Sequence, residues 1–160
     1  MVSESSKSGS GGAGGGELSA DERAAWRGLL RAHAHLVREL DAELTREHDL
    51  PLSAYDVLAQ LAHAPGRRLR MSGLADSVLL TPSGLTRLVD RLCREGLLER
   101  QRCDSDARGS FAALTERGLA RFAEARPTHH DGVRRLFLGH FSADELRLLA
   151  RGWERVAPAG

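Results

Sequence analysis

Arginine and hydroxyl side chains recur in TPSGLTRLVDRLCREG, residues 81–96, at spacings that would suit contact with a polyanion. If the leucines and the valine of this stretch face inward, the outward positions are Ser83, Thr86, Arg87, Asp90, Arg91 and Arg94. An arginine in the first turns of such a helix can donate two hydrogen bonds to guanine in a DNA major groove, and hydroxyls can contact bases or phosphates. The alternative interpretation is an ordinary solvated helix face.

Two short helices are predicted to position these side chains. Thr81 is placed to cap the second helix, Pro82 suits its first position, and Gly96 is placed to end it. Apolar residues at i, i+3, i+4 and i+7 form its buried stripe: Leu85, Leu88, Val89 and Leu92. Ser72 is predicted to cap the preceding helix, GLADSVLL, and Ser72 and Thr81 are themselves candidate DNA contacts. The pattern predicts a helix-turn-helix.

A loop, CDSDARG, lies between two predicted strands, LLERQR and SFAAL. Asp106 and Arg108 are two residues apart in this loop, so their side chains can share a face and form an ion pair. An arginine aimed by such a pair at the tip of a hairpin can enter a narrow DNA minor groove. The alternative is a hydrophilic loop whose exposed pair contributes at most ~1 kcal/mol.

The remaining elements are predicted from caps and helical periodicity. Ser19 and Glu22 form a capping box that begins a helix ending near His48, and a shorter helix follows over residues 53–64. RRLRM, residues 67–71, favours a short strand. A long helix is expected from Thr115 to about Phe141, bent or interrupted near Pro127 and Gly132, and a second SADE at 142–145 caps a last helix. The predicted fold is mainly α with a small β-hairpin wing (α+β), a winged helix-turn-helix.

Composition sets limits on the class of protein. The chain has 160 residues, 41% of them hydrophobic, and a net charge of +1. Residues 17–64 hold five Arg against nine acidic residues, whereas residues 65–108 hold nine Arg against six, so attraction for phosphate is expected in the middle of the chain. Two cysteines, no apolar run long enough for a bilayer and no signal pattern predict a cytoplasmic protein without a membrane partner. Residues 1–16, rich in Ser and Gly, are predicted to form a disordered tail.

Two segments resemble the MarR family of bacterial transcriptional regulators. DARGSFAALTERG, residues 106–118, is similar to that family's wing signature, D-x-R followed by a strand and L-T-x-x-G. LTRLVDRLCREGLLER, residues 85–100, is similar to its recognition helix and the strand that leaves it. In element order the resemblance extends over residues 21–156.

The resemblance implies an obligate homodimer that straddles an inverted repeat in double-stranded DNA. It implies that Arg108 enters the minor groove with Asp106 as its partner, and it places Ser83, Thr86, Arg87 and Arg91 at the major groove. Two departures stand out: Asp104 occupies a place where many members carry proline, and Ala107 replaces a usual second arginine. A looser wing tip and one missing contact are therefore expected.

The resemblance also divides the chain into regions. Residues 17–50 are the expected N-terminal dimerisation helix, residues 51–114 the DNA-binding lobe, and residues 115–160 the C-terminal dimerisation helices. The apolar stripe of the first helix and Leu146, Leu149 and Trp153 of the last fit burial against a second copy, although a monomeric helical core is the alternative. Members often bind small aromatic or anionic effectors, for which the candidates here are Trp26, His33, Arg38 and Tyr55.

Other chemistry finds less support in the sequence. Cys93 and Cys103 allow a redox-switch hypothesis, with quiet structural thiols as the alternative. His129, His130 and His140 lack ligand spacing, so no metal site is expected. No enzyme motif and no cofactor motif is found.

The sequence therefore predicts a homodimeric, sequence-specific repressor released by a small molecule. Two alternatives remain: a winged-helix protein-interaction module without sequence-specific DNA binding, and a regulator that responds to cysteine oxidation.

Overall fold

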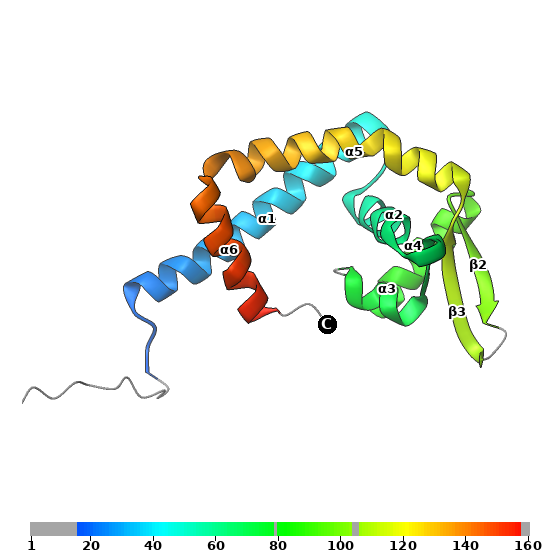
Figure 1. Ribbon diagram of the computed structural model, residues 1–160, viewed down its shortest axis with the longest axis horizontal. Helices are drawn as coiled ribbons and strands as arrows, with labels where there is room; N and C mark the ends of the chain where they lie inside the picture. The colour runs from blue at the N-terminus through cyan, green and yellow to red at the C-terminus, as the bar shows by residue number, and fades with distance from the viewer. Residues whose placement is uncertain (1–15, 79, 104–105, 158–160) are drawn as a thin grey trace, which may run out of the picture. The chain divides into compact units, whose positions relative to one another are not determined.

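The computed structural model describes residues 16–78, 80–103 and 106–157, except for the side chains of residues 76, 77, 102, 103 and 106–109. Its elements along the chain are α1 (Ala20–His48), α2 (Leu52–His63), η1 (Pro65–Arg67), β1 (Arg68–Arg70), α3 (Met71–Ser77), α4 (Pro82–Arg94), β2 (Leu98–Cys103), β3 (Asp106–Leu114), α5 (Glu116–Leu136), η2 (Leu138–His140) and α6 (Ala143–Val156). Figure 1 shows the ribbon, and the mainly helical fold with a small sheet confirms the predicted winged helix-turn-helix. The predicted tail, residues 1–16, lies outside the described residues apart from Gly16.

Side-chain caps begin the helices where the sequence predicted them. Ser19 N–H donates to Glu22 at 2.7 Å, and Ser142 N–H donates to Glu145 at the same distance, so both capping boxes form. The Thr81 and Thr115 hydroxyls accept from the backbone N–H of Gly84 and Gly118. These bonds satisfy amide groups that have no partner inside the helix, which fixes where each helix starts.

Four predicted boundaries were wrong. Ser72 lies inside α3 and does not cap it, because β1 leads directly into that helix and Arg70 stands at the cap position; α3 also ends at Ser77, before the predicted end at residue 80. The second helix begins at Leu52 rather than at Ser53. β3 extends back to Asp106, into the predicted loop, because its pairing with β2 continues that far.

The long C-terminal helix also differs from the prediction. α5 runs through Pro127 without interruption and ends at Leu136, earlier than predicted. Proline removes one helical hydrogen bond. Ala125 and Gly132, on either side of this proline, are both buried.

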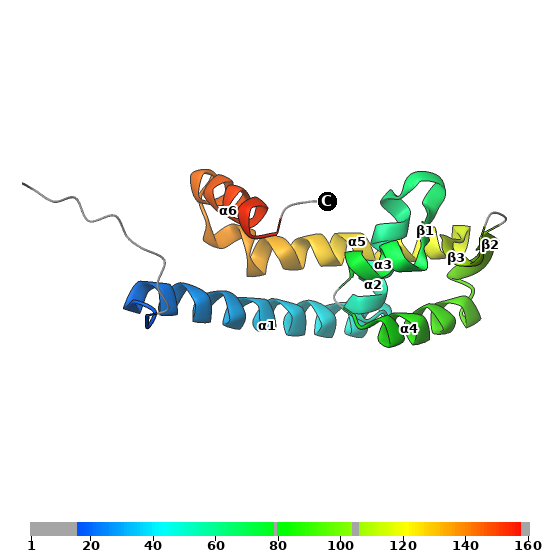
Figure 2. The ribbon, with the colours of Figure 1, turned by 90° about the horizontal axis from the view of Figure 1, so that it is seen from below.

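The sheet contains the predicted hairpin and a third strand. Its order is β1-β3-β2, and both pairings are antiparallel. Arg70 lies opposite Phe111, which in turn lies opposite Gln101, and a register shift occurs at Arg102 and Cys103. Figure 2 shows β1 beside the other two strands. The short RRLRM strand therefore widens the wing into a three-stranded sheet.

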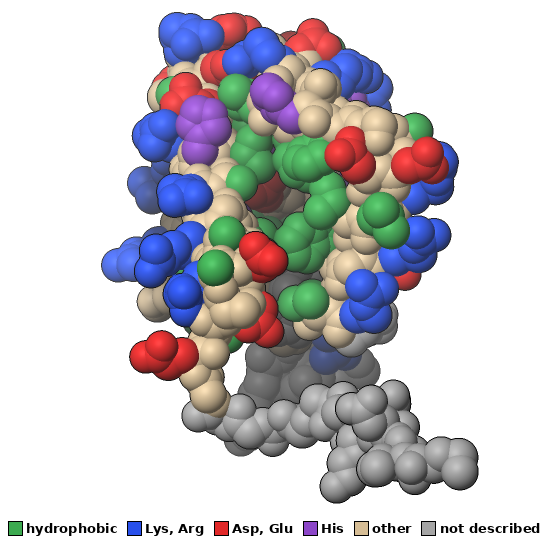
Figure 3. All heavy atoms as spheres, turned by 90° about the vertical axis from the view of Figure 1, so that its left-hand side faces the viewer, with side chains coloured by type: hydrophobic (Ala, Val, Ile, Leu, Met, Phe, Trp, Pro, Cys, Tyr) green, Lys and Arg blue, Asp and Glu red, His purple; other side chains and the backbone are tan. Residues whose placement is uncertain are grey.

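The chain divides into two compact units, residues 1–33 and residues 34–160. Within the second unit, apolar side chains of several helices and strands form one core, whose largest fully buried members are Leu44, Leu58, Leu61, Leu74, Leu85, Leu92, Val57 and Val89. In the first unit, Trp26, Leu29 and Leu30 of α1 are exposed. The face drawn in Figure 3 likewise exposes hydrophobic side chains among charged ones.

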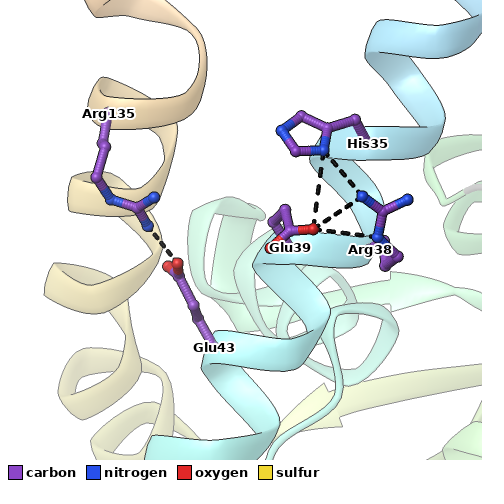
Figure 4. Close-up of polar contacts among 5 residues, drawn as sticks. All are labelled: His35, Arg38, Glu39, Glu43 and Arg135. Atoms are coloured by element: carbon purple, nitrogen blue, oxygen red, sulfur yellow. Dashed lines mark hydrogen bonds and ion pairs between the residues drawn. The ribbon is translucent and has the colours of Figure 1, made fainter.

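Glycine permits two close approaches within the second unit. A Cβ on Gly118 would lie 2.1 Å from the Leu97 carbonyl oxygen, and one on Gly132 would lie 2.6 Å from Leu40 Cδ2. Gly118 thus allows the start of α5 to pack on the segment that follows α4. Gly132 allows α5 to pack on the C-terminal half of α1, where Arg135 also pairs with Glu43 (Figure 4). In the described part of the chain, no helix is both long and apolar enough to cross a bilayer.

Candidate nucleic-acid interface

Helix α4 presents the predicted outward face. Leu85, Val89 and Leu92 are at most 1% exposed and hold one side of the helix in the core. The side chains of Ser83, Thr86 and Arg87 are exposed on the first turns. The stripe of apolar residues therefore orients the helix, and its N-terminal half is accessible to a large partner.

The hydroxyl groups of this region are partly engaged within the helix. The Thr81 hydroxyl accepts from Gly84 N–H at 3.2 Å and lies 3.4 Å from the Ser83 hydroxyl. The Thr86 hydroxyl donates to the Pro82 carbonyl at 3.0 Å. Thr86 thus keeps its methyl group and an acceptor for an external contact, whereas Thr81 serves first as the helix cap.

Helices α3 and α4 form a shallow cleft of about 400 Å³. Ser72 of α3 and Thr86 of α4 both line it, together with Met71, Ala75, Pro82 and Leu85. The structure therefore brings Ser72, which is exposed, to the same surface as the first turns of α4. In helix-turn-helix proteins the first turns of the second helix enter the DNA major groove.

The charged residues of α4 differ in how strongly they are engaged. Asp90 accepts from Arg100 of β2 at 2.8 and 3.1 Å, so this pair ties the helix to the sheet. Arg91 lies 3.7 Å from Glu95, one turn further along. Arg87 has no ion-pair partner among the described side chains and is exposed. Arg87 is therefore more available for an external acceptor than Arg91, and Arg94 at the other end of the helix is also exposed.

The wing residues are placed by their backbone alone. Asp106 begins β3 and Arg108 follows two residues later in the same strand. Their side chains lie outside the described part of the chain, as do residues 104–105. The predicted pairing of Asp106 with Arg108, and the looseness expected from Asp104 and Ala107, therefore stay predictions.

Arg68 and Arg70 of β1 lie on the sheet and were not among the predicted DNA contacts. The guanidinium carbons of Arg68 and Arg70 lie 5.4 and 5.5 Å from the centre of the Phe111 ring. Their alternation in RRLR was a usable signal, because residues two apart on a strand share a face. The contact of these arginines with Phe111 could not be predicted from the sequence, because Phe111 is about forty residues away along the chain.

The candidate effector residues lie in dissimilar surroundings. Trp26 and His33 belong to residues 16–33 and are exposed. The Arg38 guanidinium donates to Glu39 at 2.9 and 3.1 Å and lies 3.0 Å from His35, at the surface (Figure 4). Tyr55 is 3% exposed. Of the four, only Tyr55 lies in the core, whereas the Arg38 charge is already met by its neighbour on α1.

Tyr55 belongs to an aromatic cluster between α2 and α5. Its ring stacks on His129 at 4.3 Å and lies 5.4 Å from that of Phe122. Burial lowers the pKa of His129, and the neighbouring His130 lowers it further. His129 Nδ1 is buried without a hydrogen-bond partner. The cluster therefore favours neutral His129.

The cysteine and histidine hypotheses can be compared with this geometry. Cys93 is a free, half-buried thiol, and burial raises its pKa, with a smaller opposing effect from Arg100. A raised pKa lowers the thiolate fraction and with it the reactivity toward oxidants. The side chain of Cys103 lies outside the described residues. Among the described residues, no group of three His, Cys, Asp or Glu side chains converges as a metal site.

A winged helix-turn-helix whose second helix exposes an arginine at its first turns is the architecture of a DNA-binding protein. Comparison with known proteins agrees. A family model described as MarR family matches residues 48–109. The fold is similar to the MarR family transcriptional regulator Sco3205 from Streptomyces coelicolor, solved in complex with DNA, with 35% identity, a TM-score of 0.83 and coverage of 88% of this chain and 89% of that one.

Two further relatives support the assignment. AbsC, another MarR family regulator from Streptomyces coelicolor, is 33% identical with a TM-score of 0.81, covering 88% of this chain and 95% of its own. The HTH-type transcriptional regulator MhqR of Bacillus subtilis is 28% identical over 80% of this chain and 86% of its own length. The chain belongs to the MarR family and is a transcriptional regulator, which confirms the expectation of a regulator rather than an enzyme.

Proposed function

We propose that the protein is a sequence-specific, homodimeric repressor that binds a pseudo-palindromic operator and is released by a small-molecule effector. The observation that carries the proposal is Arg87, exposed and without an ion-pair partner among the described side chains, on the first turns of a helix whose other face is buried. Ser83 lies on the same turns. An arginine so placed can bind guanine with two hydrogen bonds, which is the commonest specific contact with DNA.

Dimerisation is supported by apolar surface on the terminal helices. Trp26 and Leu30 of α1, and Leu148 and Trp153 of α6, are 42 to 60% exposed in the single chain. A second copy would remove this surface from water, as at a dimer interface. In this proposal residues 17–50 and 115–160 serve dimerisation and residues 51–114 form the DNA lobe. The start of α5 also belongs to the lobe's core, because Phe122 and Ala125 are buried there.

The effector part of the proposal centres on the aromatic cluster of Tyr55, Phe122 and His129. A ligand with a hydrogen-bonding group would satisfy His129 Nδ1, which is buried without a partner. A ligand bound there would contact both α2 of the DNA lobe and α5. It would release DNA if it bound more tightly to an arrangement of α2 and α5 that has lower affinity for DNA.

Selection of binding sites from random duplex DNA, at two salt concentrations, tests the proposal. We expect enrichment of an inverted repeat with half-sites about one helical turn apart. Arg87→Ala should then cost about 1–3 kcal/mol of binding and relax the preference at one base pair. Arg126→Ala, an exposed arginine of α5, is the matched control. Sequence-blind, weak binding by folded wild-type protein would favour the protein-interaction module instead.

A further inference from the structure

The outer face of the three-stranded sheet carries a second basic surface, formed by Arg68, Arg70, Phe111 and Gln101. Arg68 and Arg70 are both exposed and lie two residues apart on β1, so they share one face of the sheet. Phe111 lies opposite Arg70 on β3, and Gln101 lies opposite Phe111 on β2. The four side chains therefore occupy adjoining positions on three strands.

One aromatic ring orients both guanidinium groups. Their central carbons lie 5.4 and 5.5 Å from the Phe111 ring centre, within the range of a cation–π contact. Arg68 also donates to Gln101 Oε1 at 3.4 Å. Both guanidinium groups thus lie against the same ring. Glu99 of β2 shares this face, and its carboxylate accepts from the Gln101 amide at 2.7 Å.

We propose that Arg68 and Arg70 bind the phosphate backbone of duplex DNA beside the base pairs read by α4. This inference rests on the proposed function. Two planar guanidinium groups held on a rigid ring suit phosphate oxygens, because the fork geometry of arginine matches them and little side-chain freedom remains to be lost. Such contacts position a protein on DNA and carry no base information.

The location supports DNA over other polyanions. Arg70 immediately precedes α3, and Ser72 of the cleft described above follows two residues later. Phe111 lies three residues from Arg108 on β3, about 10 Å along an extended strand. The basic surface thus lies between the start of α3 and the predicted minor-groove residue. It extends one continuous footprint rather than forming a separate site.

The test measures duplex affinity as a function of salt for the full chain. The probes are the duplex selected by wild-type protein and an unrelated duplex of equal length. Arg68→Ala should lower the slope of log affinity against log salt by about 0.9 for each phosphate that is no longer neutralised, and a dimer carries each residue twice. Affinity should fall roughly three- to tenfold, by the same factor on both duplexes. Arg68→Ala/Arg70→Ala should reduce both quantities further.

Two variants control for fold and chemistry. Arg68→Lys keeps the charge and gives up the planar stacking, so it should retain most of the wild-type slope. Arg126→Ala should retain all of it. An Arg68→Ala protein that unfolds at the wild-type temperature and keeps the wild-type slope and affinity would overturn the inference, while the proposed function would stand. A change in base preference would also overturn it, because a phosphate contact reads no bases. Wild-type protein that binds neither duplex would overturn the proposed function, and this inference with it.

Discussion

The DNA lobe and the terminal helices of this chain differ in how far their apolar side chains are buried. In the lobe, residues from α2, α3, α4 and both hairpin strands join one core, and many of its leucines are fully buried. None of the fourteen residues of α6, all of them described, is buried. In α1 only Leu40 and Leu44 are buried, both near its C-terminal end. The lobe supplies most of the core, to which the ends of α1 and α5 next to it also contribute, whereas α6 and the N-terminal half of α1 leave apolar surface exposed.

The difference separates two sources of stability. The lobe gains its stability from apolar surface that the single chain removes from water. For the terminal helices, local caps and charge pairs are present, such as the Ser142–Glu145 capping box, but these contribute only modestly. The apolar surface of the terminal helices contributes fully to stability only when another molecule covers it.

The largest effect is expected from a cavity in the lobe. Leu58 of α2 is fully buried, so Leu58→Ala should lower the free energy of unfolding by about 4 kcal/mol, through reduced burial and an unfilled cavity. Gln60→Ala, an exposed change on the same helix, should alter it by no more than about 0.5 kcal/mol. Urea denaturation measures both. A loss below about 1 kcal/mol for Leu58→Ala would mean that the lobe's core is not the main source of stability.

A slightly smaller loss of stability is expected from Gly118→Ala, because the start of α5 lies too close to Leu97 to leave room for a side chain. Gly118→Ala would place a Cβ 2.1 Å from the Leu97 carbonyl oxygen, so backbone must move, at a cost of about 3 kcal/mol. Gly73→Ala is the matched control in α3, since its added Cβ would meet nothing within 4 Å. That change should be neutral or stabilising by up to about 1 kcal/mol. Equal unfolding temperatures for the two variants would contradict the close contact.

Trp153→Ala tests the terminal helices. Trp153 is 42% exposed in the single chain, so its removal should leave the lobe folded. If a second copy covers it, the dimer should weaken by about 2 kcal/mol, as buried aromatic residues dominate such interfaces. Sedimentation equilibrium measures the dissociation constant, with Glu154→Ala as the control on the same helix. An unchanged dimer would place the interface elsewhere and weaken the comparison.

The smallest effect concerns pH and the junction of α2 with α5. The folded state lowers the pKa of His129, so the unfolded chain binds more protons below the usual histidine pKa of about 6.5. Stability should therefore fall as the pH is lowered from about 7 toward 5. His129→Phe keeps a ring against Tyr55 and should reduce this dependence. Unfolding measured at pH 7, 6 and 5 gives both slopes, and identical slopes would contradict the assignment to His129.

Helix positions could be predicted well from sequence, because their signals are local. The caps at Ser19, Thr81, Thr115 and Ser142 act on amides three residues away, and each was found where it was expected. The positive φ of Gly96, which follows α4, agrees with the predicted end of that helix. The predicted boundaries were wrong where an element's limits depend on pairing with a distant segment. The start of α3 depends on β1, whose pairing with β3 brings together residues more than forty positions apart.

The candidate interface was predictable only in part. Periodicity correctly placed Ser83, Thr86 and Arg87 on the exposed side of α4. It could not show that Asp90, on the same side of α4, binds Arg100 of β2, because that contact forms between two different elements. Nor could it select Arg68 and Arg70, since the ring that orients them belongs to another strand.

The sequence by itself determined which segments are helices, where four of their caps lie and which face of α4 turns inward, because hydrogen bonds and apolar spacing within a few residues decide these features. Only the tertiary structure decided that Glu43 pairs with Arg135 and which strand completes the sheet. It also decided where glycine is required, as at Gly118 against Leu97. These outcomes depend on contacts between residues far apart in the chain, and the spacing of residues along one segment carries no information about its distant neighbours.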